Sequence, residues 1–176
     1  MSHTFNISTT TAFVVAGTGT PVAKHGNRSV SSQSGSADVL EALGVKIDLQ
    51  PDRVERCLFE TGFGFLFAPL FHPAMKSVGP IRRELGVKTV FNMLGPMVTP
   101  SFPKSQMIGV FSLETARLYN YIYQQTDSNY SIIYSLDGYD EISLTGDFKV
   151  ISNGEEQLYS PLQIGMPTLK PSDLFG

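Results

Sequence analysis

The chain has 176 residues, 41% of them hydrophobic and 16% charged, which is enough for one compact domain with a buried core. Its formal net charge of -3, with both signs interspersed, disfavours a nucleic-acid partner because no basic face is available for a phosphate backbone. The single cysteine, Cys57, cannot form an internal disulfide and sits at an apolar position of a helical pattern, so we expect it to pack. No apolar run approaches the ~20 residues of a bilayer span and no signal peptide is evident, so we expect a cytoplasmic location.

The first half of the chain alternates short apolar runs with helical patterns, which is typical of an α/β domain with a largely parallel sheet. We expect Ser8 to cap a helix that stops at Gly17, followed by a short buried strand at 21–23 that runs into a polar loop. Further predicted elements are helices over 37–43, from Pro51, and from Pro73 toward Gly86, a strand at 63–67, and a buried extended segment at 89–94.

The second half has the pattern of a βαβ unit followed by a hairpin. Segments 106–111 and 130–134 read as strands on either side of a helix over 113–125. The pair Asn153-Gly154 between two apolar runs is a strong signal for a two-residue turn. We therefore predict one α/β domain over 1–176 that ends in an antiparallel hairpin.

The densest polar segment is 24–36, which is rich in hydroxyls and glycine and leads into the start of the helix over 37–43. Backbone N–H groups at that helix start, the serine hydroxyls and Lys24 would all favour a phosphate. Such loops are also ordinary solvated turns with a serine cap, and this alternative stays open.

Two further polar sets are weaker signals. Thr4, Asn6, Ser8 and Thr9 precede the first helix and could bind an anion, although a plain N-cap is the simpler interpretation. The adjacent pair Asp140-Glu141 follows a predicted strand and could hold Mg²⁺ with substrate phosphates, although such pairs are usually solvated surface.

Other charged residues give little information alone. Arg82 and Arg83 follow Pro80, and one of them could hold a carboxylate, but surface placement is the simpler interpretation. His3 and His72 have no metal-ligand spacing, so we expect structural or solvent roles for them.

Six motifs, in this order, resemble anthranilate phosphoribosyltransferases over nearly the whole chain. They are Thr4-Phe5-Asn6-Ile7-Ser8-Thr9, Lys24-His25-Gly26-Asn27-Arg28, Ser34-Gly35-Ser36-Ala37-Asp38, Phe71-His72-Pro73-Ala74-Met75-Lys76, Phe91-Asn92-Met93-Leu94-Gly95-Pro96 and Asp140-Glu141. The resemblance implies the α/β lobe of the nucleoside phosphorylase-like phosphoribosyltransferases. It also implies transfer of the phosphoribosyl group of 5-phosphoribosyl 1-pyrophosphate to the amine of anthranilate in tryptophan biosynthesis, with Mg²⁺, and a homodimeric complete protein.

The resemblance also implies roles for individual residues, with catalysis by charge and position and no catalytic base. Ser8, Asp140 and Glu141 would serve the magnesium ions. Asn27, Arg82 and His25 would hold anthranilate. Phosphoribosyl pyrophosphate would be held by Thr4, Asn6, Ser8, Thr9, Lys24, His25, Gly26, Asn27, Arg28, Ser29, Val30, Ser31, Ser32 and Ser36.

The chain departs from the family pattern at both ends. Family members carry a Gly-Thr-Gly-Gly-Asp loop just upstream of the first motif, and they continue beyond Gly176. The run Gly17-Thr18-Gly19-Thr20 resembles that loop only superficially, because it follows a helix and lacks the aspartate. We therefore expect an isolated chain that is impaired in catalysis and that self-associates or is marginally stable.

Three other functions are compatible with parts of the pattern. A pyrimidine nucleoside phosphorylase is the nearest, but the motif Lys24-His25-Gly26-Asn27-Arg28 favours the first interpretation. A noncatalytic, nucleic-acid-binding relative is disfavoured by the acidic balance and by the intact Asp140-Glu141 pair. An inactive fragment is the third.

Overall fold

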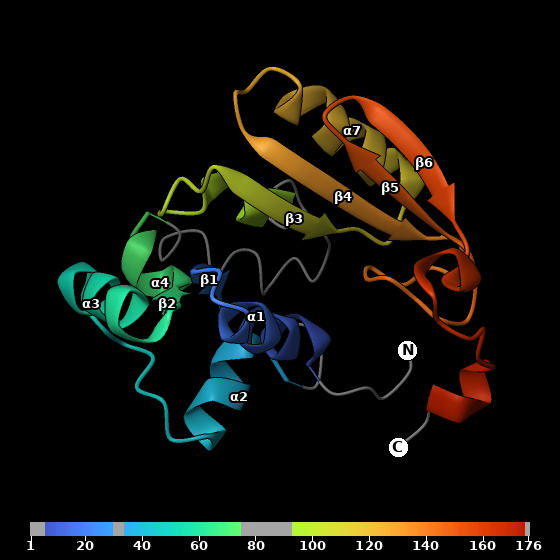
Figure 1. Ribbon diagram of the computed structural model, residues 1–176. Coiled ribbons are helices and arrows are strands. Elements are labelled where there is room, and N and C mark those ends of the chain that lie inside the picture. The colour runs from blue at the N-terminus through green and yellow to red at the C-terminus, as the bar shows by residue number, and fades with distance from the viewer. Residues whose placement is uncertain (1–5, 30–33, 75–92, 175–176) are drawn as a thin grey trace, which may run out of the picture. The chain divides into compact units, whose positions relative to one another are not determined.

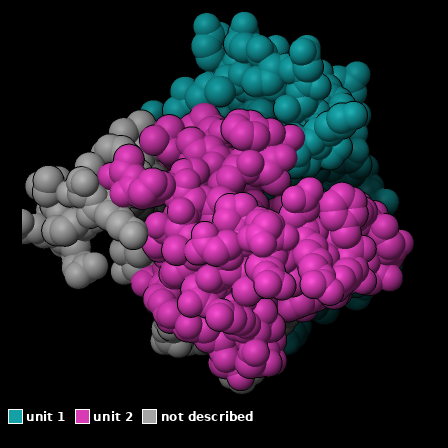
Figure 2. Space-filling view, turned by 90° about the vertical axis from the view of Figure 1, so that its left-hand side faces the viewer, with its two compact units in different colours: residues 1–4, 103–176 teal, residues 5–102 magenta. Residues whose placement is uncertain are grey.

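The computed structural model describes residues 6–29, 34–74 and 93–174. The chain divides into two compact units, which Figure 2 shows in different colours. The N-terminal unit comprises residues 5–102, and the C-terminal unit comprises residues 103–176 together with residues 1–4.

The N-terminal unit is built on two parallel strands, β1 (Val22–Gly26) and β2 (Phe63–Phe67), in which Val22 pairs with Phe63 and Gly26 with Phe67. Parallel strands require a long crossover connection, and two helices supply it here. The helices of this unit are α1 (Ile7–Gly17), α2 (Ser36–Ala42), α3 (Pro51–Thr61), α4 (Ala68–Phe71) and the 3₁₀ helix η1 (Gly95–Val98) (Figure 1).

The core of this unit lies between α2 and one face of β2. Ala37 and Leu40 are fully buried against Phe65 and Ile47. Helix α3 begins with Pro51 at its first position, where the missing N–H costs nothing, and ends at Gly62, whose φ of 74° is the left-handed conformation that glycine adopts readily. The core thus fixes β1 and β2 side by side and brings their carboxyl ends together.

The C-terminal unit is a four-stranded mixed sheet in the order β3-β4-β5-β6. Parallel strands β3 (Ser105–Gly109) and β4 (Asn129–Ser135) are joined by α7 (Leu113–Tyr123), which confirms the predicted βαβ unit. Strands β5 (Phe148–Ser152) and β6 (Glu155–Tyr159) add to it in antiparallel pairing. Two 3₁₀ helices follow, η2 (Pro161–Ile164) and η3 (Pro171–Leu174).

The hairpin between β5 and β6 turns through the two residues that the sequence indicated. Asn153 has φ 47° and Gly154 has φ 86°. Two positive φ values in succession match the right-handed twist of the flanking strands, and asparagine followed by glycine is the pair that tolerates them best. The predicted C-terminal antiparallel hairpin is confirmed, as is the mixed α/β fold.

Three details of the predicted elements are wrong or fall outside the described residues. Asn6, rather than Ser8, caps α1, because its Oδ1 accepts the N–H of Thr9 at 2.9 Å. The segment predicted as extended over 89–94 is helical at its described end, where Leu94 has φ -72° and ψ -22°. The helix predicted from Pro73 toward Gly86 lies largely outside the described residues.

Across the three described ranges, no helix is long and apolar enough to cross a membrane.

Candidate functional site

The first group of predicted site residues lies at the carboxyl end of β1. Lys24, His25 and Gly26 belong to the strand itself, so the prediction of a loop that begins at residue 24 is corrected to one that begins at Asn27. In α/β folds ligands bind at the carboxyl ends of parallel strands, where loops converge and main-chain groups are free of the sheet. The position of this group therefore suits a ligand site.

The loop after β1 is closed at its neck by a single carboxylate. Asp38 Oδ2 accepts the N–H of Ser29 at 2.9 Å and the N–H of Gly35 at 2.8 Å, and the Asn27 carbonyl accepts the N–H of Ala37 at 3.2 Å. These two backbone N–H groups, together with Arg28, hold the pKa of Asp38 below its ordinary value. The carboxylate thus ties together the two ends of residues 30–33, which lie outside the described residues and include the predicted ligands Val30, Ser31 and Ser32.

Where the two ends of this loop meet, at Ser29 and Gly35, there is no room for a side chain on Gly35. A Cβ at Gly35 would lie 2.4 Å from Ser29 N and 2.6 Å from Asn27 O, both backbone atoms. A Cβ at Gly26 would lie 2.9 Å from the ring of Phe65 and 3.1 Å from the Cβ of Ser36. Glycine at both positions lets the chain return on itself immediately after the strand.

Two groups that were predicted to hold phosphate are engaged within the chain. The N–H of Ala37 at the start of α2 is donated to Asn27, as above. Arg28 forms a two-pronged ion pair with Glu41, one branch of which is 2.7 Å long, and its guanidinium lies 5.9 Å from the centre of the Phe67 ring. In this conformation Arg28 braces the loop against α2, and binding a phosphate would require it to leave Glu41.

Lys24 presents its ammonium to the start of α1. Its Nζ donates to Ser8 Oγ at 2.7 Å, and burial lowers the pKa of Lys24 to about 8. Asn6, the cap of α1, also donates from Nδ2 to the Ser34 carbonyl at 3.2 Å, which links the helix start to the loop after β1. The structure therefore brings together Asn6, Ser8 and Lys24, which the sequence analysis had taken from two separate motifs.

Thr9 differs from its neighbours in this set. Its side chain is only 1% exposed, and its Oγ1 has no hydrogen-bond partner among the described residues. Burial of an unpaired hydroxyl costs free energy. The predicted contact of Thr9 with phosphoribosyl pyrophosphate is untested. Thr4 and Arg82 lie outside the described residues.

His25 contacts two segments that are distant in the sequence. Its Nδ1 lies 3.3 Å from the carbonyl oxygen of Gly95, and its Nε2 lies 3.2 Å from Nε2 of His72. The two rings meet edge to face, with centroids 5.0 Å apart and planes at 69°. Burial and, to a smaller extent, the charges of His72 and Lys24 lower the pKa of His25.

The second group of predicted site residues, Asp140 and Glu141, lies in the C-terminal unit, in the loop that follows β4. The hydroxyl of Ser135, the last residue of β4, donates to the Glu141 carbonyl and accepts the N–H of Ser143 at 3.1 Å. Asp137 accepts the hydroxyl of Ser143 at 2.9 Å and also that of Thr145. These bonds fold the loop back over the carboxyl ends of β3 and β4.

The loop presses directly on β3. A Cβ at Gly109, the last residue of β3, would lie 1.6 Å from the carbonyl oxygen of Asp140, so only glycine allows this approach. Burial and the adjacent carboxyl of Asp140 raise the pKa of Glu141 to about 8. A carboxyl group that resists ionisation beside a second one is suited to a cation, which would supply the missing positive charge.

Asp140 and Glu141 are chemically suited to bind Mg²⁺, whereas the predicted third ligand, Ser8, lies in the other unit. Mg²⁺ that also binds substrate phosphates commonly takes one or two protein carboxylates, and Asp140 and Glu141 are two. The described ranges contain no cluster of three or more His, Cys, Asp or Glu side chains that could form an all-protein metal site. Ser8 belongs to the other unit, so its predicted place beside this pair stays a prediction.

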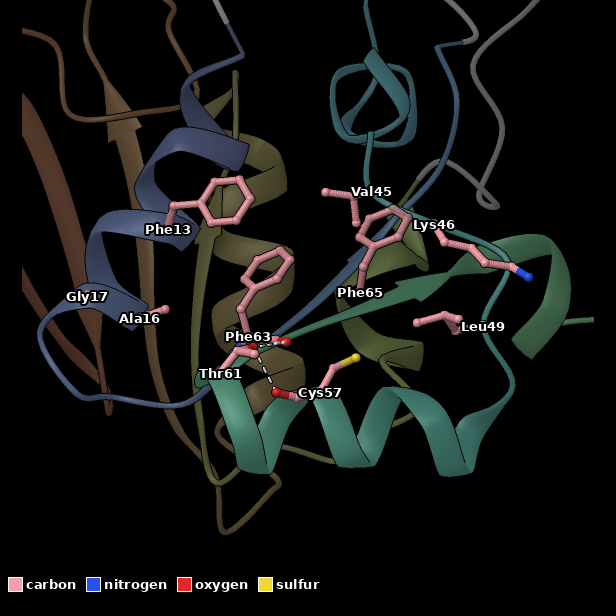
Figure 3. Close-up of a pocket in the computed structure, with 10 residues that line it drawn as sticks. All are labelled: Phe13, Ala16, Gly17, Val45, Lys46, Leu49, Cys57, Thr61, Phe63 and Phe65. Atoms are coloured by element: carbon pink, nitrogen blue, oxygen red, sulfur yellow. Dashed lines mark hydrogen bonds between the residues drawn. The ribbon is translucent and has the colours of Figure 1, made fainter. Parts of the chain in front are cut away.

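A separate hollow of the N-terminal unit is apolar. An open pocket of about 500 Å³ lies between α1, α3 and β2, and Figure 3 shows its lining side chains. Cys57, which we expected to pack, is partly buried at its edge. None of the predicted site residues lines this pocket, and its lining residues are Phe13, Ala16, Gly17, Val45, Lys46, Leu49, Cys57, Thr61, Phe63 and Phe65.

Three residues that shape the site were not assigned to it from the sequence. Asp38 was named only within one family motif, His72 was named in another motif and given a structural or solvent role, and Gly109 was not singled out. Asp38 carried a usable signal, because an acid three residues after a glycine at a helix start can accept the N–H of the cap residue. The roles of His72 and Gly109 depend on contacts across 47 residues and across a loop, which spacing does not reveal.

Comparison with known proteins relates this arrangement to one family. A family model described as "Glycosyl transferase family, a/b domain" matches residues 1–175. An anthranilate phosphoribosyltransferase of Christiangramia forsetii is 57% identical over 173 residues, which are 98% of this chain and 52% of the relative. The protein of the same name from Flavobacterium psychrophilum is 58% identical over the same shares.

Solved structures agree with the sequence relatives. The crystal structure of anthranilate phosphoribosyltransferase from Thermus thermophilus is similar with a TM-score of 0.89 at 42% identity, over 97% of this chain and 52% of that one. The Saccharomyces cerevisiae enzyme in complex with PRPP and Mg gives a TM-score of 0.90 at 32% identity, over 99% of this chain and 50% of that one. The chain therefore spans about half the length of the relatives it matches.

Proposed function

Since the chain belongs to the glycosyl transferase family with an a/b domain, we propose that it is the central part of an anthranilate phosphoribosyltransferase. The reaction would transfer the phosphoribosyl group of 5-phosphoribosyl 1-pyrophosphate to the amine of anthranilate, a step of tryptophan biosynthesis. The observation that carries this proposal is the identity of 57% to a relative of that name over 98% of the chain, which includes all six motifs. The closed loop at the end of β1 supports it.

We assign phosphoribosyl pyrophosphate to the carboxyl end of β1. The Lys24 ammonium and the Ser8 hydroxyl are already in contact at 2.7 Å, and Asn6 links them to the loop. A phosphate oxygen between them would accept from both, and its charge would favour the protonated lysine whose pKa burial lowers. The remaining contacts would come from Thr4, Thr9, His25, Gly26, Asn27, Arg28, Ser29, Val30, Ser31, Ser32 and Ser36.

Asp140 and Glu141 would hold Mg²⁺ in this proposal, with Ser8 as a further ligand. The ion would neutralise charge on the pyrophosphate as it leaves. Asp140 and Glu141 would contribute by ionising together once the cation is present, which their mutual repulsion opposes in its absence. The magnesium of the Saccharomyces cerevisiae complex is consistent with this cofactor.

Anthranilate would lie beside the same strand end, held by Asn27, His25 and Arg82. Its amine is a neutral nucleophile, so the chain needs to orient it rather than deprotonate it first. In this proposal Lys24 would stabilise the departing anion, and no residue would need to act as a base. For the complete protein we propose a homodimer and a cytoplasmic location.

The test is the loss of anthranilate fluorescence when the chain, phosphoribosyl pyrophosphate and Mg²⁺ are mixed. We expect a loss that depends on both additions, and we expect Lys24→Met to lower kcat/KM by at least about tenfold because a buried charge-assisted contact is removed. Lys46→Met is the matched control, since Lys46 is exposed and lines the apolar pocket instead. A folded chain that gives no loss of fluorescence would mean that the activity requires the rest of the protein.

A further inference from the structure

The hydrogen bonds of His25 determine where its proton lies. A carbonyl oxygen can only accept, so the contact of 3.3 Å between His25 Nδ1 and Gly95 O requires a proton on Nδ1. In a neutral imidazole the other nitrogen then carries the lone pair. His25 Nε2 is therefore an acceptor, and the nitrogen facing it at 3.2 Å, His72 Nε2, must be the donor.

The surroundings favour the neutral state of His25. His25 is partly buried and has Lys24 as its chain neighbour, and both circumstances lower the pKa of His25. A neutral histidine in water prefers the other tautomer, with its proton on Nε2, so the arrangement found here has to be imposed by its neighbours. Only His72 and Gly95 contact the ring nitrogens among the described residues.

The backbone of His72 is well placed to impose it. Strand β2 ends at Phe67, α4 follows without a break, and the N–H of His72 closes α4 by donating to the Ala68 carbonyl at 2.9 Å. Leu66 of β2 pairs with His25 of β1, so the fold carries His72 back to the ring of His25. The position of His72 is thus fixed by the sheet and by one helical turn.

We propose that His72 is a positioning residue for the acceptor side of the site, the part beside Asn27 that would bind anthranilate. His72 holds His25 as the Nδ1–H tautomer, and His25 in turn fastens the turn at Gly95 to the end of β1. The proposal rests on the proposed function only in calling this the acceptor side. Both ring nitrogens of His25 are then occupied, so His25 offers no N–H to the incoming amine or carboxylate. Its contribution is the shape of the wall beside Asn27, and it does not act as an acid or a base.

The tautomers can be read directly by two-bond ¹⁵N–¹H correlation spectra of the ¹⁵N-labelled chain at about pH 8, where histidines are neutral. The chain has 3 histidines, and each variant identifies its own signal by the signal's absence. We expect the Nδ1–H form for His25 and the Nε2–H form for His72. An Nε2–H form of His25 in the unaltered chain would overturn the proposal.

Two variants of His72 test whether its N–H donor, and not only its bulk, sets the tautomer of His25. His72→Gln keeps an N–H donor, so His25 should stay in its Nδ1–H form. His72→Leu removes the donor and should shift His25 toward the Nε2–H form, with unchanged circular dichroism as the check on folding. If His25 keeps its tautomer in His72→Leu, Gly95 alone sets it and His72 is not the positioning residue.

The kinetic arm tests the acceptor side. His72→Leu should raise KM for anthranilate about tenfold, leave KM for phosphoribosyl pyrophosphate within about twofold, and be rescued by His72→Gln. Equal changes in both KM values would overturn the acceptor-side assignment. An unaltered chain that shows the expected tautomers but no transfer reaction would mean that the activity requires the rest of the protein, while the positioning of His25 by His72 would stand.

Discussion

The two units solve the same structural problem with different chemistry. Each places a loop at the carboxyl end of a parallel strand, after β1 in one unit and after β4 in the other. After β1 the loop is tied by a carboxylate, since Asp38 accepts two backbone N–H groups. After β4 the Ser135 hydroxyl anchors the backbone of the loop, and the carboxyl groups of Asp140 and Glu141 remain crowded together.

The difference has an electrostatic consequence. The charge of Asp38 is satisfied within the chain, which lowers its pKa, and the strand before the loop carries the Lys24 ammonium. Burial, and after it the adjacent carboxyl of Asp140, raises the pKa of Glu141. Under the proposed function, the loop after β4 would therefore gain stability from a cation, whereas the neck of the loop after β1 is already held by Asp38.

Close backbone contact at the two loops gives the largest expected effects. Gly109→Ala places a Cβ 1.6 Å from Asp140 O, and Gly35→Ala places one 2.4 Å from Ser29 N. Backbone atoms yield less easily than side-chain ends, so we expect losses of about 3 kcal/mol or more for Gly109→Ala and about 1–3 kcal/mol for Gly35→Ala, measured by urea unfolding.

Gly17→Ala is the control for both substitutions. Gly17 ends α1 with no atom within 4 Å of the added Cβ and without a positive φ, so the change should be neutral or slightly stabilising. If Gly109→Ala unfolds at the same urea concentration as Gly17→Ala, the loop after β4 does not press on β3. The comparison between the two loops would then fail.

The hydroxyl that holds the loop after β4 gives an intermediate effect. Ser135 is fully buried, and Ser135→Ala would leave the Glu141 carbonyl and the Ser143 N–H without this partner. We expect a loss of about 1–3 kcal/mol in the free energy of unfolding. Ser131→Ala, in the same strand, removes only a partly buried contact of 2.9 Å with the Ser152 hydroxyl and should cost under about 1 kcal/mol. Equal losses would mean that Ser135 does not anchor the loop.

Local signals in the sequence were sufficient for the elements and insufficient for the loops. Asn153-Gly154 specifies its turn through the φ values that these residues tolerate, and Pro51 and Gly62 mark the ends of α3. At the start of α1 the helix begins one residue before Ser8, and Asn6 is the cap because its Oδ1 accepts the N–H of Thr9; its further contact with the Ser34 carbonyl, 28 residues away, was not predictable from local pattern. The sequence could indicate the candidate site residues, but their partners depend on how the chain folds back.

The same limit applies to charge. Glu41 forms an ion pair with Arg28, so Arg28 is not free to bind a phosphate in this conformation. Glu41 lies on α2, 13 residues after Arg28. Neither its spacing nor its type distinguishes it from a solvated surface acid. The carboxyl pair at 140–141 was identified because both members are adjacent, although the burial that raises the pKa of Glu141 required the structure.

The smallest expected effect is a difference in pH dependence between the loops. The pKa of Asp38 is lowered in the folded chain, so its contribution to stability is present above its ordinary pKa and is lost as the pH falls toward the lowered value. The pKa of Glu141 is raised to about 8, so without Mg²⁺ the folded chain should lose stability as the pH rises from the ordinary glutamate range to about 8. Urea unfolding across this range measures both slopes.

Substitutions and metal assign each slope to its loop. Asp38→Asn should flatten only the acidic slope, and Glu141→Gln only the slope that ends near pH 8. Because binding of Mg²⁺ favours ionised carboxylates, added Mg²⁺ should flatten the second slope and bind more tightly as the pH rises, while the first stays unchanged. A slope over this range that survives both Glu141→Gln and Mg²⁺ would have to come from another group. Lys24 would give a slope of the opposite sign at higher pH, because burial lowers its pKa to about 8 and the folded chain then gains stability as the pH rises from about 8 toward the ordinary lysine value. Lys24→Met separates them, since it would remove a slope due to the lysine and leave one due to the carboxyl pair.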